Sequence, residues 1–277
     1  MSISPLNPLV SVVVPSFNEQ PQVIRASLES IRNQTFRRFE CIVVDESTNE
    51  ELAAACQSIC AEDPRFIYFH PTERLGLPGS LNLAISHARS SLIARFDSDD
   101  VCVPDRLALQ VAFLTAHPEI SLVGGAIIII NDKGNILAHR RYPENSAKIA
   151  QGMQLTTTIA HPTVMFRKEA IQKYGGYKPD FHFAEDLDLW LRWMNAGLHF
   201  ANLPDILVHY RQVSMTRNQR HWRYNLRARI SNLSFSYLIL RIFGIACIAT
   251  WVAIPKILQE CIFKLLILRR RSLGEIY

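Results

Sequence analysis

Three aspartates at positions 97, 99 and 100 directly follow the apolar run IARF. In an extended chain every second side chain points to the same side, so Asp97 and Asp99 are expected to project together from a strand end. Like charges at one spot repel each other, which stability alone does not explain. Mg²⁺ or Mn²⁺ held by one or two carboxylates commonly completes its ligand shell with substrate phosphates. The spacing therefore predicts a divalent-cation site on Asp97 and Asp99, and the glycine and distal glutamate of a calcium loop are missing from the sequence.

A second acidic group, Asp45-Glu46-Ser47, comes directly after the apolar run CIVV. Asp and Ser at such a position commonly accept hydrogen bonds from free backbone N–H groups where a strand turns into a helix. A capping turn and a ligand-binding turn are both compatible with these three residues.

A third acidic group, Glu185, Asp186 and Asp188, begins the predicted helix EDLDLWLRW. Acidic residues in a first helical turn interact favourably with the macrodipole, so a purely stabilising role is one interpretation. On a helical wheel the buried stripe is centred on Leu187, with Asp186 and Asp188 on its flanks and Glu185 on the far side. A carboxylate on such a flank can face a cleft, be partly desolvated and act as a general base. The residues leave both interpretations open.

Short β-branched runs alternate with amphipathic stretches over the first 130 residues, and this pattern predicts the elements that position the acidic groups. Strands are expected at Val10–Val14, Cys41–Val44, Phe66–Phe69, Leu92–Phe96 and Ile120–Ile130, and helices at Glu19–Gln34, Glu51–Ala61, Pro78–Ala88 and Pro104–Ala116. The alternation indicates the α/β class, with a mostly parallel, Rossmann-like sheet and helices on both faces. Ligands bind such sheets beyond the carboxyl ends of the strands, where the acidic groups are expected.

The pattern weakens after Asp132 and stays weak through Gln154, as in an insertion. Beyond it we expect a short apolar segment at Thr163–Phe166, a helix at Ala184–Ala196 and a last strand at residues 206–210. The character of the sequence changes after Arg211. We therefore expect a catalytic domain of residues 1–211 and a basic, apolar helical tail of residues 212–277.

The composition is that of a globular protein. The 277 residues are 48% hydrophobic and 20% charged, which excludes a disordered chain, and 11 Gly, 14 Pro and 6 Cys are too few for collagen or a disulfide scaffold. We expect the scattered cysteines to be reduced, buried thiols. The first residues show neither a basic region nor a long apolar run of the kind that secretory signals carry, so a cytoplasmic location is expected.

The net charge of +5 is divided unevenly along the chain. Residues 1–210 hold 18 Lys+Arg and 23 Asp+Glu, whereas residues 211–277 hold 12 and 2. This asymmetry indicates that the tail faces an anionic partner. Anionic lipid is favoured over nucleic acid, because aliphatic residues rather than a stacking platform separate the basic residues.

The tail contains an apolar stretch, residues 233–255, with Arg241 as its single charge. Its length is sufficient for a bilayer core if it is one helix, but only 14 residues separate Arg241 from Lys256. A second apolar run, Ile257–Leu268, ends in three arginines. A pair of helices packed on the catalytic body, or a homodimer face, is the alternative. We favour monotopic or re-entrant attachment at the inner face of the cell membrane.

The ordered segments VSVVVPSFNE, CIVVDES, GLPGSLNLAISHARSSLIARFDSDDVCVPDRLALQ, HPTVMFRKEA and AEDLDLWLRW resemble the inverting family-2 glycosyltransferases of GT-A fold. The resemblance covers about residues 8–211 and is closest to bacterial members that build surface polysaccharides. It implies a nucleotide-sugar-binding part at about 8–130 and an acceptor part at about 131–211. It also implies Mg²⁺ or Mn²⁺ as cofactor, a nucleoside-diphosphate sugar as donor and a glycan or lipid-linked acceptor.

The resemblance also implies roles for single residues. Asp186 matches the usual catalytic base, with Glu185 beside it, and Asp97 and Asp99 match the aspartates that hold the metal-bound diphosphate. His161 and Trp190 fall on the acceptor side, although a histidine before a proline is more often a turn residue. The nucleotide-sugar-binding set comprises Pro15, Ser16, Asn18, Glu19, Asp45, Glu46, Asn82, Arg95, Asp97, Ser98 and Arg211.

The sequence departs from the family pattern at three places. Glu46 stands where an aspartate is usual. No histidine follows Tyr210-Arg211, so Arg211 or Arg217 would have to take the place of that histidine. The QxxRW signature of processive polymerases is absent after the predicted helix of Asp186, which favours single additions. A nucleotidyltransferase, or a catalytically silent membrane-bound scaffold of a polysaccharide assembly complex, is the alternative function.

Overall fold

The computed structural model describes residues 7–212, 219–255 and 259. The strands are β1 (Val10–Ser16), β2 (Phe39–Asp45), β3 (Phe66–Phe69), β4 (Leu92–Arg95), β5 (Val101–Cys102), β6 (Ile120–Ile130), β7 (Ile136–Arg140), β8 (Met165–Arg167) and β9 (His199–Arg211). The helices are α1 (Pro21–Arg32), α2 (Glu50–Ala61), α3 (Gly76–His87), α4 (Arg106–Ala116), α5 (Ser146–Met153), α6 (Lys168–Tyr174), α7 (Glu185–Asn195), α8 (Gln219–Ser231) and α9 (Leu238–Ala253), with a 3₁₀ turn at His161–Thr163.

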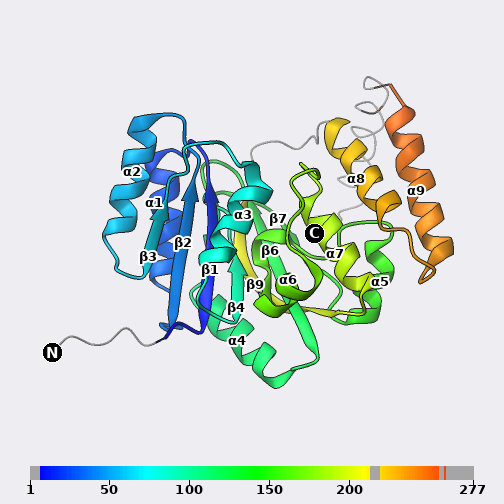
Figure 1. The fold of residues 1–277 in the computed structure, drawn as a ribbon, viewed down its shortest axis with the longest axis horizontal. Helices are drawn as coiled ribbons and strands as arrows, with labels where there is room; N and C mark the ends of the chain where they lie inside the picture. The colour runs from blue at the N-terminus through cyan, green and yellow to red at the C-terminus, as the bar shows by residue number, and fades with distance from the viewer. Residues whose placement is uncertain (1–6, 213–218, 256–258, 260–277) are drawn as a thin grey trace.

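All strands of the described residues join one sheet, in the order β3-β2-β1-β4-β8-β6-β9-β5, with β7 paired to β6 (Figure 1). The pairs among β1, β2, β3 and β4 are parallel, as is β6 with β9, and β8, β5 and β7 pair in the antiparallel sense. The chain runs outward from β1 to β3 and then returns to place β4 on the other side of β1. This reversal is the topological switch point at which such sheets bind ligands. The predicted α/β class is confirmed.

Alternate side chains of each strand serve two separate cores. Val12 and Val14 of β1 pack with the apolar faces of α1, α2 and α4, whereas Val13 packs with α3 and α7 on the opposite face. This alternation follows from the two-residue period of a strand, and burial on both faces explains the uninterrupted VSVVV sequence. Helices therefore cover both faces of the sheet.

Several elements differ from the sequence prediction. The stretch with weak signals, Asp132–Gln154, contains β7 and α5, and β9 begins at His199 instead of residue 206. The two-residue β5 and the short α6 were not predicted. Each of these elements either is short or mixes polar with apolar residues, so its hydrophobic periodicity is weak.

The described part of the tail forms two helices, and the second of them lies within the predicted apolar stretch of residues 233–255. Helix α8 ends at Ser231, and α9 begins at Leu238 and packs against α8, with the Trp222 and Trp251 ring centroids 6.0 Å apart. Of the helices in the described part of the chain, none is long and apolar enough to cross a bilayer. The predicted second run, Ile257–Leu268, its following arginines and Arg217 lie outside the described residues, apart from Gln259.

Candidate active site

The carboxyl ends of β1, β2 and β4 lie side by side at the switch point. In the β1–β2 register Ser16 is the partner of Asp45, and Val13 is the partner of Arg95 in β4. The backbone N–H of Glu46 donates to the Ser16 carbonyl (2.9 Å), which extends the pairing by one residue. The residues that follow these strands are thus brought to one edge of the sheet, as the sequence predicts.

Asn18 and Asp45 hold the loops after β1 and β2 together. Asn18 has φ +53°, a conformation that asparagine tolerates well, and its side-chain oxygen accepts from the N–H groups of Thr48 (3.0 Å) and Asn49 (3.2 Å). The fully buried Asp45 accepts from the Ser47 hydroxyl (2.6 Å) and the Tyr68 hydroxyl (2.9 Å). Both side chains, predicted to bind nucleotide, therefore shape the loops with their own hydrogen bonds.

Glu46 is buried and supports the start of α3. Its Oε2 accepts from the N–H groups of Leu75 and Gly76, both at 3.0 Å, and its Oε1 accepts from the Ser80 hydroxyl. A carboxylate at a helix N-terminus satisfies donors that have no intrahelical partner. The carboxylates of the Asp45–Ser47 turn therefore accept hydrogen bonds from backbone N–H groups, as in a capping turn. These N–H groups belong to the turn itself and to the start of α3, whereas the N-terminus of α2 is capped by Asn49.

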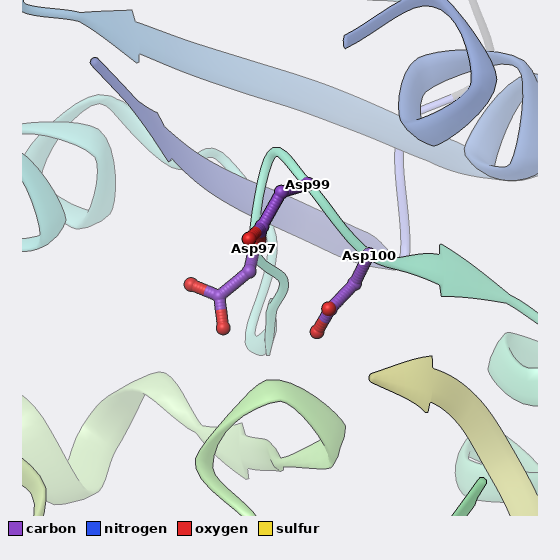
Figure 2. A group of neighbouring side chains, drawn as sticks. All are labelled: Asp97, Asp99 and Asp100. Atoms are coloured by element: carbon purple, nitrogen blue, oxygen red, sulfur yellow. The ribbon is translucent and has the colours of Figure 1, made fainter. Parts of the chain in front are cut away.

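The aspartates after β4 are crowded on one turn before β5 (Figure 2). Ligand oxygens of Asp97, Asp99 and Asp100 all lie within 4.8 Å of one another. Burial and then the charge of Asp97 raise the pKa of Asp99 to about 6, and burial with the charges of Asp97 and Asp99 raises the pKa of Asp100 well above its usual range. Buried like charges at this spacing favour a bound proton or a bound cation.

Two arginines surround the crowded turn. The buried Arg95 forms an ion pair with Asp97. Arg211 donates its backbone N–H to Asp100 Oδ1 (2.8 Å) and its Nε–H to the Asp99 carbonyl (2.9 Å), which ties the end of β9 to the turn. Oδ2 of Asp100 is buried without a hydrogen-bond partner among the residues that the structure describes.

Two further predicted nucleotide-site residues, Glu19 and Ser98, lie at this turn, and a third, Pro15, lies in β1. Burial, followed by the charges of Asp99 and Asp97, raises the pKa of Glu19 to about 7, so the loop after β1 faces the crowded turn. Ser98 is buried within the turn, and Pro15 is half-buried in β1.

Helix α7 places its acidic residues in three different environments. Asp186 is partly exposed, and its Oδ1 accepts from the Leu187 N–H (2.7 Å). Asp188 is fully buried and accepts from Arg192 (2.8 Å) and Asn232 (2.9 Å). The wheel prediction for Glu185 is wrong: it is buried, because α7 is covered on almost all sides by β-sheet, α6 and α8.

The surroundings of Glu185 disfavour its ionised form. Burial, and then the charge of Asp186, raises the pKa of Glu185 to about 8, and Asp97 contributes in the same direction. Its Oε2 is buried with no hydrogen-bond partner in the described part of the chain. Because Asp97 and Arg95 both influence Glu185, the start of α7 and the turn after β4 belong to one electrostatic site.

The residues predicted for the acceptor side are buried below this site. His161 Nε2 and the Tyr177 hydroxyl are 2.9 Å apart, and burial followed by the charge of Arg95 lowers the pKa of His161 well below its usual range. Trp190 is fully buried against the edge of the His161 ring, so it supports the site and has no surface to offer an acceptor. Asn82 is likewise occupied, by the backbone N–H (3.0 Å) and carbonyl (2.7 Å) of Tyr177.

Residues 11–175 match the family described as "Glycosyl transferase family 2". AmsE of Erwinia amylovora, an amylovoran biosynthesis glycosyltransferase, is 33% identical over 220 residues, which cover 78% of this chain and 81% of AmsE. WbnJ of Escherichia coli, an O-antigen biosynthesis glycosyltransferase, is 34% identical over 206 residues, covering 73% and 79% of the two chains. The chain belongs to glycosyltransferase family 2.

Solved structures share the fold of this family-2 glycosyltransferase. Residues 1–349 of S. aureus TarS in complex with UDP align with a TM-score of 0.62 at 20% identity, covering 85% of this chain and 70% of that one. The mannosyltransferase PcManGT from Pyrobaculum calidifontis, in complex with GDP-Man and Mn²⁺, aligns with a TM-score of 0.60 at 18% identity, covering 96% and 81%. The predicted GT-A-type fold is confirmed.

Sequence reasoning missed three side chains at the site of this glycosyltransferase. Asp100 was not assigned to the metal set, although its position beside Asp99 was a signal, since a turn can gather consecutive residues that a strand separates. Tyr68 and Tyr177 gave no comparable signal. Each reaches the site through a contact between segments far apart in sequence, from β3 to Asp45 and from the loop before α7 to His161.

Proposed function

We propose that this enzyme transfers a sugar from a nucleoside-diphosphate sugar to an acceptor hydroxyl, with inversion and with Mg²⁺ or Mn²⁺ as cofactor. The observation that carries the proposal is the crowding of Asp97, Asp99 and Asp100 on one turn that shares an electrostatic site with Glu185 at the start of α7. A diphosphate with its cation and an acceptor with its base need two adjacent acidic groups of this kind.

The donor set fits a hard divalent cation. Three carboxylates within reach of one another are the oxygen ligands that Mg²⁺ and Mn²⁺ prefer, and the buried Oδ2 of Asp100 is without a hydrogen-bond partner among the described residues. Asp97 and Asp99, with Asp100, would hold the ion. When bound, it supplies Lewis-acid stabilisation of the charge on a departing diphosphate.

The nucleoside would lie over the ends of β1 and β2. Next to them, beyond the ends of β2 and β3, a hollow of about 700 Å³ is lined by residues that include Ser47, Tyr68, His70 and Arg74. Phe17 offers an aromatic face, with the Arg74 guanidinium 3.9 Å from its ring centroid. Asn18, Asp45 and Glu46 would fix the loops that form this hollow. Ser16 ends β1 beside Asp45, Glu19 faces the acidic turn, and Ser98 and Arg211 belong to the turn or contact it.

The proposed reaction is a single displacement. We assign Asp186 as the base, because it is the acidic residue of α7 that is not buried. It takes the proton of the acceptor hydroxyl, whose oxygen forms a bond to the anomeric carbon. The bond from that carbon to the phosphate oxygen breaks, and the electron pair leaves with the diphosphate. One displacement inverts the configuration.

The relatives suggest the biological setting. AmsE and WbnJ are named for amylovoran and O-antigen biosynthesis, so we place this enzyme in surface polysaccharide biosynthesis, with a glycan or lipid-linked acceptor. A lipid-linked acceptor requires an enzyme at the inner face of the membrane, which agrees with the basic, apolar tail. We assign the transfer to residues 1–211 and the attachment to residues 212–277.

Thermal denaturation with UDP, GDP, dTDP and CDP, each with and without Mn²⁺, tests the donor and cofactor assignments. A ligand that binds only the native state stabilises it by about 2.7 kcal/mol at a hundredfold excess over Kd. We expect a metal-dependent shift with one nucleotide, lost in Asp99→Ala and retained in the control Asp205→Ala, whose carboxylate is exposed on β9. The absence of any shift in a folded protein would overturn the transferase proposal and favour a silent scaffold.

A further inference from the structure

Helix α9 has the opposite polarity to a helix on a water-facing surface. Its single charged residue, Arg241, is buried against the body and donates to the Asn232 carbonyl (2.5 Å) and Asn195 Oδ1 (2.7 Å). Gly244 faces the same way, where a Cβ would lie 2.2 Å from the Gln154 carbonyl oxygen. The polar and closely packed side of α9 is therefore its inner side.

The outer side of α9 is apolar along its whole length. The exposed residues of α9 recur at helical spacing: Ile239, Ile242, Phe243, Ala246, Cys247, Ala249, Thr250 and Ala253. Ile239 is 84% exposed, and Phe235 in the turn before α9 is 94% exposed. Ile230 and Leu233 continue the same exposed apolar surface at the end of α8. We call these residues of α9, with Ile230, Leu233 and Phe235, the outer face. An apolar patch of this extent marks an interaction site.

The charge around the outer face indicates the kind of partner. Residues 219–255 contain five arginines and no acidic residue, and three of the arginines, Arg220, Arg223 and Arg227, are exposed on α8. A symmetric contact between two copies would bring these basic helices together, which like charges oppose. An anionic lipid surface offers apolar chains and negative headgroups at the same place.

The length of α9 determines how it meets such a surface. Its 16 residues span about 24 Å, whereas a bilayer core requires about 20 apolar residues. A continuous apolar stripe on one side, with hydrogen-bonded groups on the other, suits a helix that lies in the plane of the interface. Figure 1 places α9 at the outer edge of the molecule, beyond α8.

We infer that the outer face is a docking surface for an anionic membrane, with α9 lying flat in the headgroup region. This inference rests on the membrane location proposed above and assigns it to named residues. It also connects docking to the acceptor side of the site, since Asn232, after α8, donates to Asp188 in α7 (2.9 Å). Just before the N-terminus of α7, Phe183 contacts the His221 ring of α8, with centroids 4.5 Å apart, and at the C-terminal end Asn195 donates to the Asn232 carbonyl (2.9 Å). The docked helices thus hold both ends of the helix that begins with Glu185 and Asp186.

Vesicle co-sedimentation with the full chain tests the surface. We compare the wild type, the double variant Ile239→Ser/Phe243→Ser, and the control Ile136→Ser/Leu137→Ser, which removes two exposed apolar residues from β7. The wild type and the control are expected to bind phosphatidylglycerol-containing vesicles more tightly than phosphatidylcholine vesicles. The double variant should bind at least tenfold more weakly, because two apolar side chains no longer enter the lipid.

Cys247 provides a direct probe of immersion, since it is exposed on α9 whereas Cys41, Cys56, Cys60 and Cys102 are buried. With Cys261→Ser, an environment-sensitive fluorophore on Cys247 should shift to the blue when anionic vesicles are added. Unchanged vesicle binding by the double variant, or no spectral shift of the fluorophore on Cys247, would refute the proposal that the outer face docks on a membrane. A wild-type dimer that the double variant converts to monomer, with vesicle binding unaffected, would assign the face to a second copy instead. Thermal-denaturation shifts with nucleotide, measured on the same samples, test the transferase proposal separately. Failure of the membrane proposal is therefore distinguishable from failure of the transferase proposal.

Discussion

The turns that follow β2 and β4 are both acidic, but their carboxylates have different surroundings. After β2, Asp45 accepts from Ser47 and Tyr68, and Glu46 accepts from the N–H groups at the start of α3. After β4, the aspartates face one another, and Asp100 Oδ2 has no hydrogen-bond partner within the described residues. Carboxylates of the first kind stabilise loops, whereas those of the second kind are the ones that we propose bind a ligand.

The same contrast occurs within one turn of α7. Asp188 is fully buried between Arg192 and Asn232, whereas Asp186 is partly exposed. An acidic residue at the edge of a sheet or the start of a helix is therefore not sufficient evidence of catalysis. In α7 the difference in burial separates Asp186 from Asp188, and we predict that substitutions affect stability in one class and activity in the other.

The largest expected effect follows from the pair Asp186 and Asp188. Asp186→Asn should lower kcat by about 10²–10⁴, because the amide cannot take the acceptor proton, while its oxygen still accepts from the Leu187 N–H. Asp188→Asn should instead lower the unfolding free energy by about 3 kcal/mol, since it disrupts a buried ion pair. Steady-state kinetics and thermal denaturation of both variants separate the outcomes. Normal transfer by Asp186→Asn would exclude Asp186 as the base.

Glu46→Ala tests the structural class directly. The variant leaves the Leu75 and Gly76 N–H groups and the Ser80 hydroxyl without their acceptor, so the unfolding free energy should fall by about 2–3 kcal/mol. Glu73→Ala, an exposed glutamate in the same loop, is the control and should be neutral. If Glu46→Ala kept its stability and lost only nucleotide binding, Glu46 would belong with the ligand-binding carboxylates.

The sequence predicted the elements of the first half well because their strands are buried on both faces. The bounds of β3 and β6 agree with prediction, since both strands are mainly apolar and are bordered by turn residues. The acidic groups were located by the rule that ligands meet the carboxyl ends of strands. The first strand residues of β9 and the α5 region gave weak signals because polar and apolar residues mix in them.

The environment of each acidic residue could not be predicted. Glu185 was expected on the exposed side of its helix, but α7 is enclosed by β-sheet, α6 and α8, and α8 comes later in the chain. One hydrogen bond that Asp45 accepts comes from Tyr68, which is 23 residues away in β3. Hydrogen-bond satisfaction is a property of tertiary contacts, so the contrast between the two classes becomes visible only in the structure.

Glu185 is buried like the structural carboxylates, but its Oε2 has no hydrogen-bond partner within the described residues. The pH dependence of stability tests whether Glu185 is protonated in the folded protein. Its folded pKa of about 8 lies above the usual 4.5, so the folded protein retains a proton that the unfolded chain loses. The stabilisation is fully present below pH 4.5 and is lost as the pH rises through about 8, with a slope of at most about 1.4 kcal/mol per pH unit. Glu185→Gln should remove this loss and be more stable than wild type by about 2 kcal/mol near pH 8. Parallel stability curves from pH 5 to 8 would show that Glu185 is ionised throughout.

Asp100→Asn should give the smallest change and the clearest distinction between the two turns. The amide oxygen can still accept from the Arg211 N–H, and the amide nitrogen can donate to a neighbouring carboxylate, which relieves the crowding. Without metal, the variant should therefore be more stable than wild type by about 1 kcal/mol at pH 8, where repulsion is greatest. With Mn²⁺ and nucleotide the order should reverse, because one ligand oxygen of the cation site is lost. Thermal denaturation at several Mn²⁺ concentrations measures both effects, with Asp205→Asn as the exposed control. Equal stabilisation of Asp100→Asn and wild type by Mn²⁺ would restrict the cation site to Asp97 and Asp99 and place Asp100 with the structural carboxylates.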